Sequence, residues 1–157
     1  MKFPNIAYLS LGSNIGDRYH FMEQAVWEIS TLPEVQVIKS SRILETAPLE
    51  NTNQPYFLNQ VLKIYVSTSF TVPCLLESLQ SIEDKLGRKR RSWKGPREID
   101  IDILTYEEIV MNTEYITLPH HSLYSRPFIK ELLVEMGELE IYNLFREQFY
   151  EKHHTAV

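Results

Sequence analysis

The chain carries two kinds of hydrophobic pattern, one typical of strands and one typical of helices. Apolar runs or alternations bounded by glycine, proline or asparagine predict strands. Strands are expected over residues 6–11, 35–44, 57–67 and 98–104, with a short hairpin formed by residues 109–111 and 115–118. The loop over residues 47–55 has prolines near both ends and is long enough for a functional role rather than a plain turn.

Apolar residues spaced three and four apart predict two helices among these strands. The first apolar stripe consists of Phe21, Ala25, Ile29 and Leu32, and the second of Leu75, Leu79, Ile82 and Leu86. The first helix is expected to follow a cap at Asp17 and to end at Pro33. The second is expected to begin at Pro73 and to stop at Gly87.

The resulting order, β-α-β-β-α-β, predicts an antiparallel sheet with helices packed on one face. This is an α+β fold (an α/β sandwich) of the ferredoxin-like kind, with the hairpin and C-terminal helices added. Further helical segments are expected from Arg126-Pro127 onward and over residues 139–152, so that residues 130–157 form a helical tail. We expect residues 1–157 to form a single domain. Many unrelated functions use this fold, so it does not by itself predict an activity.

Composition narrows the class of protein and its partners. The net charge of −5 argues against a duplex-binding or anionic-membrane surface. The single cysteine, Cys74, excludes an internal disulfide and favours a reducing compartment. There is no signal-like first segment and no apolar run near the ~20 residues that span a bilayer. We therefore expect a cytoplasmic protein without a membrane or nucleic-acid partner.

The most informative strand alternates isoleucine with aspartate over residues 99–103. Alternation places Asp100 and Asp102 on one face, about 6.5–7 Å apart at Cβ, and the isoleucines on the other. Two carboxylates at this spacing suit hard cations such as Mg²⁺. Arg97 stands at the strand entrance, where its planar cation suits phosphate. Taken alone, the pattern fits a metal site and an ordinary solvated strand face equally well.

Two further segments could contribute a ligand site. The loop 88–94 holds five cations and a tryptophan, which suits a polyphosphate, although a solvated charge run is the commoner explanation. No Walker-type loop is present. Phe57 and Asn59 share one face of a strand and suit a planar heterocycle, although an aromatic in a core is the commoner case. His120, seen alone, is more often structural than catalytic.

Together these segments closely resemble one family, the 6-hydroxymethyl-7,8-dihydropterin pyrophosphokinases of the folate pathway. The matching segments are Tyr8 to Arg18, Glu45 to Pro48, Gln54 to Asn59, Ile82-Glu83, Leu86 to Arg88, Gly95 to Leu104, Leu118 to His120, Arg126 and Phe128. They occur in family-like order and spacing and cover roughly residues 6–128.

The resemblance implies transfer of pyrophosphate from ATP to the hydroxymethyl group of a reduced pterin, with release of AMP. It implies that Asp100 and Asp102 hold two Mg²⁺ ions and that Arg88 and Arg97 act on the phosphates. The implied ATP-binding residues are Gln80, Glu83, Arg88, Arg97, Ile103, Thr117, His120 and Arg126. The implied pterin-binding residues are Thr46, Leu49, Phe57, Asn59 and Phe128. ATP and the pterin would be the only partners of a monomer.

The chain departs from the family pattern in the basic loop. The family often reads Arg-Trp-Gly-Pro-Arg, whereas Lys94 here separates Trp93 from Gly95, and either residue could take the place of the usual aromatic. His121 stands where proline is common. Two other classes remain open: a non-catalytic ferredoxin-like ligand-binding or regulatory module, which needs no paired acids beside a basic loop, and an RNA-binding sheet, which the negative charge disfavours.

Overall fold

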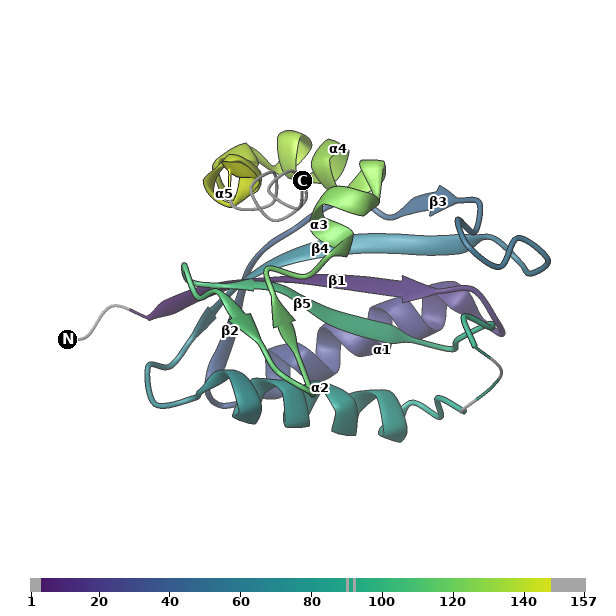
Figure 1. The fold of residues 1–157 in the computed structure, drawn as a ribbon. Coiled ribbons are helices and arrows are strands. Elements are labelled where there is room, and N and C mark those ends of the chain that lie inside the picture. The colour runs from purple at the N-terminus through teal and green to yellow at the C-terminus, as the bar shows by residue number, and fades with distance from the viewer. Residues whose placement is uncertain (1–3, 90, 92, 148–157) are drawn as a thin grey trace.

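The computed structural model describes residues 4–89, 91 and 93–147 (Figure 1). Its strands are β1 (Asn5–Ser13), β2 (Val35–Ser40), β3 (Leu44–Thr46), β4 (Phe57–Val66), β5 (Asp100–Tyr106), β6 (Met111–Asn112) and β7 (Thr117–Leu118). Its helices are α1 (Arg18–Thr31), α2 (Val72–Lys85), α3 (Ser122–Ser125), α4 (Pro127–Met136) and α5 (Leu139–Leu144).

The main sheet has the strand order β2-β4-β1-β5, and β3 pairs with β4 beside this path. All of its pairings are antiparallel. Helix α1 connects β1 to β2, and α2 connects β4 to β5, so each helix joins two strands that another strand separates. The predicted α+β class, with an antiparallel sheet and helices packed on it, is confirmed. Strand β1 lies between β4 and β5, so the ends of these three strands that carry the polar motifs are neighbours: Gly12 faces Asn59 on one side and Asp100 on the other.

Helices cover both faces of the sheet, so the expectation that they pack on one face was wrong (Figure 1). Helices α1 and α2 pack on the first face, where Leu9 and Ile103 join the main hydrophobic core. Helix α4 packs on the second face through Ile129 and Leu132, against Tyr8 and other strand residues. This second layer places the start of α4 over the sheet, next to the functional motifs.

The strand expected over residues 35–44 is interrupted, and this prediction was wrong in detail. The Ser41 hydroxyl oxygen accepts the backbone N–H of Val61 at 2.8 Å, so a side chain replaces a ladder carbonyl. Three residues, 41–43, then face two residues of β4, because Ser40 pairs with Leu62 and Leu44 pairs with Asn59. The extra residue is a bulge that separates β2 from β3.

Strand β5 begins and ends two residues later than expected. Its ladder with β1 starts where Gly12 faces Asp100. Before that point, the backbone of Arg97 bonds to Asn14: the Asn14 N–H donates to the Arg97 carbonyl at 3.0 Å. The predicted division of faces is confirmed, because Ile101 and Ile103 are at most 5% exposed whereas both aspartates remain partly open.

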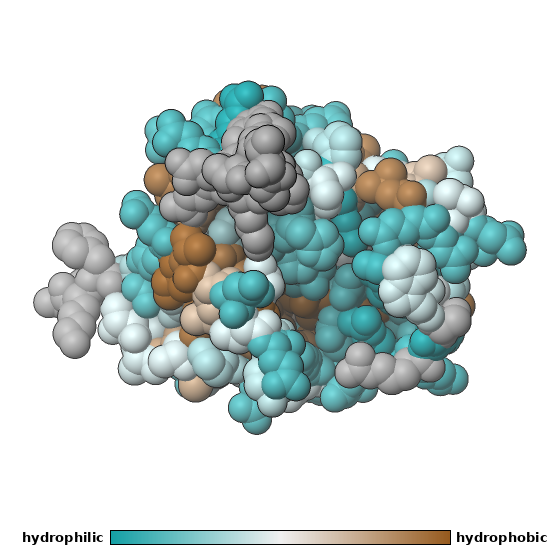
Figure 2. Space-filling model, viewed as in Figure 1, coloured by the Kyte–Doolittle hydropathy of each residue, from teal (hydrophilic) through white to brown (hydrophobic). Residues whose placement is uncertain are grey.

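The remaining elements follow the pattern with smaller differences. The predicted hairpin is present as β6 and β7, each two residues long. Helix α4 begins at Pro127 as predicted, but the short α3 before it was not expected. Helix α5 occupies the start of the 139–152 stretch, whose last residues, 148–152, lie outside the described part. Among the described residues, no helix is both long and apolar enough to cross a bilayer. The face toward the viewer in Figure 2 is mostly hydrophilic, with small separate apolar groups.

A carboxylate between α4 and α5 fastens the second helical layer to the sheet. Glu138 accepts hydrogen bonds from the ammonium of Lys63 at 2.8 Å and from the Tyr8 hydroxyl at 2.7 Å, and it pairs with Lys39 at 2.9 Å. Burial alone would raise the pKa of Glu138, but the bonds from Lys63, Lys39 and Tyr8 outweigh it and lower that pKa to about 2. The three donors therefore stabilise the ionised carboxylate.

Glu138→Gln is expected to lower the free energy of unfolding at pH 7 by about 2–3 kcal/mol, because charged donors lose their partner. The folded-state pKa lies below the unfolded value, so this stabilisation is present above about pH 4.5 and lost as the pH falls toward 2. Urea unfolding at pH 7 and pH 3 should show the variant approaching wild type at the lower pH. Glu135→Gln is the control: Glu135 pairs with the exposed Arg42, so this substitution should change stability by under ~1 kcal/mol. Equal effects of the two substitutions would contradict this role of Glu138.

Candidate active site

Three adjoining cavities lie around the start of β5. The loop cavity, about 210 Å³, is lined by Thr46 to Asn51, Gln54, Phe57, Asn59, Ser125, Phe128 and residues of β1. The basic cavity, about 350 Å³, is lined by Arg88, Lys89, Arg91, Trp93, Lys94, Asp102, His120, His121 and their neighbours. The hairpin cavity, about 380 Å³, is lined by Leu76, Gln80, Glu83, Ile103 and the β6–β7 hairpin residues Thr113 to Thr117. Among the described residues, Asp100 alone lines all three.

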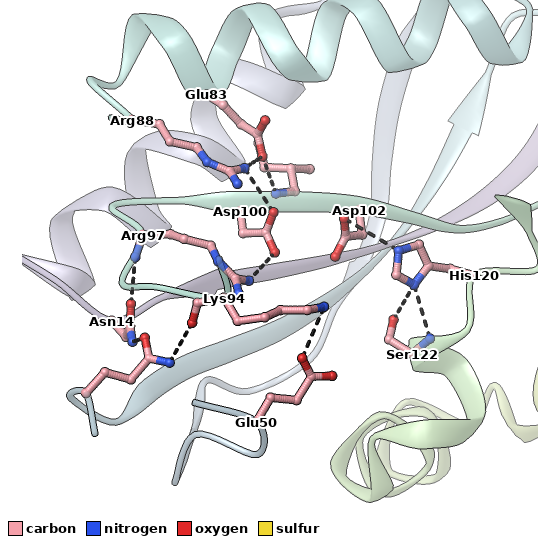
Figure 3. Close-up of polar contacts among 12 residues, drawn as sticks. Asn14, Glu50, Glu83, Arg88, Lys94, Arg97, Asp100, Asp102, His120 and Ser122 are labelled. Atoms are coloured by element: carbon pink, nitrogen blue, oxygen red, sulfur yellow. Dashed lines mark hydrogen bonds and ion pairs between the residues drawn. The ribbon is translucent and has the colours of Figure 1, made fainter. Parts of the chain in front are cut away.

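Two arginines converge on Asp100 (Figure 3). Arg97, three residues earlier, donates to one carboxylate oxygen at 2.9 Å. Arg88, just beyond the end of α2, donates to the other oxygen at 3.0 Å. Gly87 turns the chain between α2 and Arg88 with a φ of +92°, a conformation that favours glycine. Both cations thereby reach the carboxylate at the centre of the three cavities.

Glu83 anchors the same cluster from α2. One of its carboxylate oxygens accepts the backbone N–H of Ile101 at 2.8 Å and the Arg88 guanidinium at 2.7 Å. Burial raises the pKa of Glu83 to about 7, against the opposing effect of these two donors. Glu83 therefore fixes β5 and Arg88 relative to α2 while still lining the hairpin cavity.

Asp102 lies one strand repeat beyond Asp100, facing the basic and hairpin cavities. Burial and the neighbouring Asp100 charge raise its pKa, against a weaker opposing effect of Arg126. His120 lies beside it, with its Nε2 3.7 Å from an Asp102 oxygen. This separation is too long for a hydrogen bond.

The His120 ring is held in one orientation. Its Nδ1 accepts the backbone N–H of Ser122 at 3.1 Å and lies 2.7 Å from the Ser122 hydroxyl. Burial, with added repulsion from His121 and Arg126, lowers the pKa of His120 to about 4. The ring is therefore neutral at pH 7, and because Nδ1 accepts, its proton is assigned to Nε2, on the side of Asp102.

The loop cavity combines aromatic rings with an amide. The Asn59 amide donates to the Leu44 carbonyl at 3.0 Å and to the Thr46 hydroxyl at 2.7 Å. The Asn59 carbonyl oxygen takes part in neither bond and can accept from a ligand. The Arg97 guanidinium carbon lies over the Phe57 ring, 5.4 Å from the centroid of that ring. Phe128 lines the same cavity from α4. The arrangement can hold a flat polar ring.

A buried amide joins the loops that surround these cavities. Asn14 donates to the Gln54 side chain at 2.9 Å and to the Pro55 carbonyl at 3.0 Å, and it accepts the Arg97 backbone N–H at 2.8 Å. Gln54 in turn donates to the Lys94 carbonyl at 2.9 Å. Every polar atom of the Asn14 side chain is thus bonded to a loop that lines the site.

The structure brings every predicted site residue to these cavities. The loop cavity is lined by Thr46, Leu49, Phe57, Asn59 and Phe128, and it shares Arg97 and Arg126 with the basic cavity. The basic and hairpin cavities share Arg88, Asp102 and His120. The hairpin cavity is also lined by Gln80, Glu83, Ile103 and Thr117. What the sequence pattern did not reveal is the pairing of both arginines with Asp100 and the linking role of Asn14 and Gln54. Asn14 and Gln54 lie within segments that match the family, and this was the only feature of the sequence that pointed to them.

Known proteins resemble this chain over most of its length. A family model described as 7,8-dihydro-6-hydroxymethylpterin-pyrophosphokinase (HPPK) matches residues 8–138. The 2-amino-4-hydroxy-6-hydroxymethyldihydropteridine pyrophosphokinase of Bacillus subtilis (strain 168) is 42% identical over 132 residues, which cover 84% of this chain and 78% of the relative. The protein of the same name from Aquifex aeolicus (strain VF5) is 38% identical over 144 residues, covering 92% of this chain and 88% of the relative.

Longer relatives contain a matching segment. The folic acid synthesis protein fol1 of Schizosaccharomyces pombe (strain 972 / ATCC 24843) is 40% identical over 132 residues, which are 84% of this chain but 18% of that protein. A crystal structure of HPPK-DHPS in complex with substrates superposes with a TM-score of 0.63 and 16% identity, covering 96% of this chain and 45% of the other. At that identity the likeness shows the fold alone. The family match and the relatives of similar length show that this chain belongs to the HPPK family.

Proposed function

We propose that this protein transfers the pyrophosphoryl group of ATP to the hydroxymethyl group of 6-hydroxymethyl-7,8-dihydropterin and releases AMP, a step of folate biosynthesis. The hydroxyl oxygen forms a bond to the β-phosphorus, and the bond from that phosphorus to the α-phosphate oxygen breaks. The electron pair leaves with AMP, and the hydroxyl proton passes to water. We expect a single-domain cytoplasmic monomer without a nucleic-acid or membrane partner.

The position of Asp100 is the observation that carries this proposal. It lines the loop cavity, which has aromatic rings, the basic cavity, which has several arginines and lysines, and the hairpin cavity, which has polar residues such as Gln80 and Glu83. A transfer between two substrates needs their reacting atoms at such a boundary. Arg97, which lines both the loop and basic cavities, adds positive charge where the transferred group must pass.

Asp100 and Asp102 would hold Mg²⁺, with two ions expected. Among the residues that the structure describes, no set of three or more His, Cys, Asp or Glu side chains could hold a metal. Mg²⁺ in nucleotide sites commonly takes one or two carboxylates and completes its shell with phosphates and water, so this pair fits it. The raised pKa of Asp102 marks a carboxylate that a cation would stabilise in its ionised form. Bound Mg²⁺ would neutralise charge that develops on the phosphates.

The hairpin cavity suits the nucleoside end of ATP. Ile103 and Thr117 would lie at the adenine, and Gln80 and Glu83 near the ribose. The phosphates would extend into the basic cavity, where the neutral His120 can donate from Nε2. Arg88 and Arg97 would exchange part of their bonding to Asp100 for phosphate oxygens, which match their planar donor geometry.

The loop cavity suits the pterin. Phe57 and Phe128 would stack on its ring, each face contributing about 0.5–1.5 kcal/mol beyond burial. The Asn59 carbonyl oxygen would accept from the ring edge, with backbone groups of Thr46 and Leu49 beside it. Buried groups that need a partner disfavour analogues that cannot supply one.

A coupled assay for AMP tests the proposal. Purified protein with Mg²⁺, ATP and the pterin alcohol should release AMP and pterin diphosphate in a 1:1 ratio, and leaving out the pterin or the Mg²⁺ should stop the reaction. ADP or inorganic phosphate as the product would reject pyrophosphoryl transfer. Binding of the pterin without turnover would instead favour the non-catalytic ligand-binding module.

A further inference from the structure

Lys94 occupies an unusual position in the backbone. Its φ is +53°, a left-handed conformation that residues other than glycine, asparagine and aspartate rarely adopt. Its carbonyl accepts a hydrogen bond from Gln54, which the buried Asn14 fixes in turn. Strain of this kind persists only where surrounding contacts enforce it, and it is common at functional sites. The backbone at Lys94 is therefore held in place rather than left free to relax.

The side chain of Lys94 lies at the boundary between the two substrate spaces. Four described residues line both the loop and the basic cavity: Lys94, Arg97, Arg126 and Asp100. Figure 3 shows the Lys94 side chain extended between the strand that carries Asp100 and the loop that carries Glu50. Its ammonium is 3.1 Å from a Glu50 oxygen and 5.6 Å from the Trp93 ring centroid.

The charge of this lysine acts on both sides of the boundary. Its hydrogen bond is the main cause of the lowered pKa of Glu50, in the loop cavity. On the other side, Lys94 lines the basic cavity together with Arg97 and Asp100. The pairing with Glu50 is partly solvated, with the two side chains 31% and 51% exposed, so it is a weak bond that a dianionic group could replace.

We propose that Lys94 contacts the transferred pyrophosphoryl group and stabilises its charge during the reaction. This proposal rests on the proposed function. As the pterin oxygen bonds to the β-phosphorus and the bond to the α-phosphate breaks, negative charge is spread over the oxygens of the moving group. Lys94 keeps its proton throughout and moves from Glu50 to those oxygens. It is thus a third cation at the crossing point, beside Arg97 and Arg126, supplied where family members often have an aromatic.

Lys94→Gly tests this with little risk to the fold, because glycine adopts a positive φ without strain. The variant should have an unchanged or higher melting temperature and a turnover number lower by about 10- to 100-fold. Lys94→Arg, which keeps the charge, should stay closer to wild type. The matched control is Glu107→Gly: Glu107 has a φ of +49° and lines none of the three cavities, so its loss should leave turnover at the wild-type value.

Two further measurements separate substrate contact from a structural role. Calorimetry with an α,β-non-hydrolysable ATP analogue should show weaker binding to Lys94→Gly, whereas AMP, which lacks the β- and γ-phosphates, should bind as to wild type. Glu50→Gln removes the ion pair but keeps the ammonium, so its turnover should fall less than that of Lys94→Gly.

Wild-type turnover in the Lys94→Gly variant would overturn the proposal, as would equal losses in Lys94→Gly and Glu50→Gln or equal weakening of AMP and the analogue. These outcomes assume that the wild-type protein releases AMP in a pterin-dependent way. If it does not, the proposed function fails first, and the two failures are distinguishable.

Discussion

Asp102→Asn is expected to lower the turnover number on the order of 10³-fold while leaving the protein as stable as wild type or more stable. Activity falls because an amide cannot supply the anionic oxygen that Mg²⁺ needs. Stability does not fall, because the folded-state pKa of Asp102 lies above its unfolded value: ionisation at neutral pH costs free energy in the fold, and asparagine removes that cost.

Asp100→Asn should lose as much activity but should also lower the melting temperature, because Arg88 and Arg97 both lose a charged partner. AMP release and thermal unfolding of the two variants at pH 7 check these expectations. Asp84→Asn, on the exposed side of α2, is the control and should change neither quantity. An Asp100→Asn Asp102→Asn double variant that still turned over without metal would remove both acids from the mechanism.

Arg97→Lys is expected to lower the turnover number about 100-fold, although it keeps the charge. Arg97 donates to Asp100 at 2.9 Å and covers the Phe57 ring at 5.4 Å, so one planar cation joins the acid cluster to the loop cavity. Lysine has no planar group to stack and cannot hold a phosphate with two parallel bonds.

Steady-state kinetics with both substrates should place most of the Arg97→Lys loss in kcat rather than in the KM for the pterin. The matched control is Arg42→Lys, the same change at a surface arginine that pairs with Glu131 and Glu135. Wild-type kcat in Arg97→Lys would show that a point charge is enough at this position.

Most helices and strands could be predicted from the sequence, because the patterns that specify them, alternation and helix caps, involve residues only a few positions apart. The alternation around Ile101 assigned both faces of β5, and the Asp17 cap of α1 is present, with its side chain accepting the His20 N–H at 3.2 Å. The break at Ser41 could not be predicted, because it depends on a bond to Val61, 20 residues away. The packing of α4 on the second face likewise depends on tertiary contacts.

The candidate site was predictable as a set of residues but not as a set of contacts. The motifs gather because they lie at adjoining ends of β1, β4 and β5, which strand order explains. Family membership is confirmed. The bonds of Arg88 to Glu83 and Asp100 could not be predicted, because the distance between α2 and β5 is set by the tertiary structure. The role of each residue toward ATP, Mg²⁺ and the pterin stays a prediction.

The bonding of Asn14 has a consequence for how this molecule can be altered. One side chain ties the end of β1, the segment that contains Gln54 and the approach to β5 into a single frame. A longer or shorter version of any one segment would draw the others out of register. Chimeras with related chains should therefore exchange these three connections together, whereas the turn at Glu107, outside the frame, can be replaced alone.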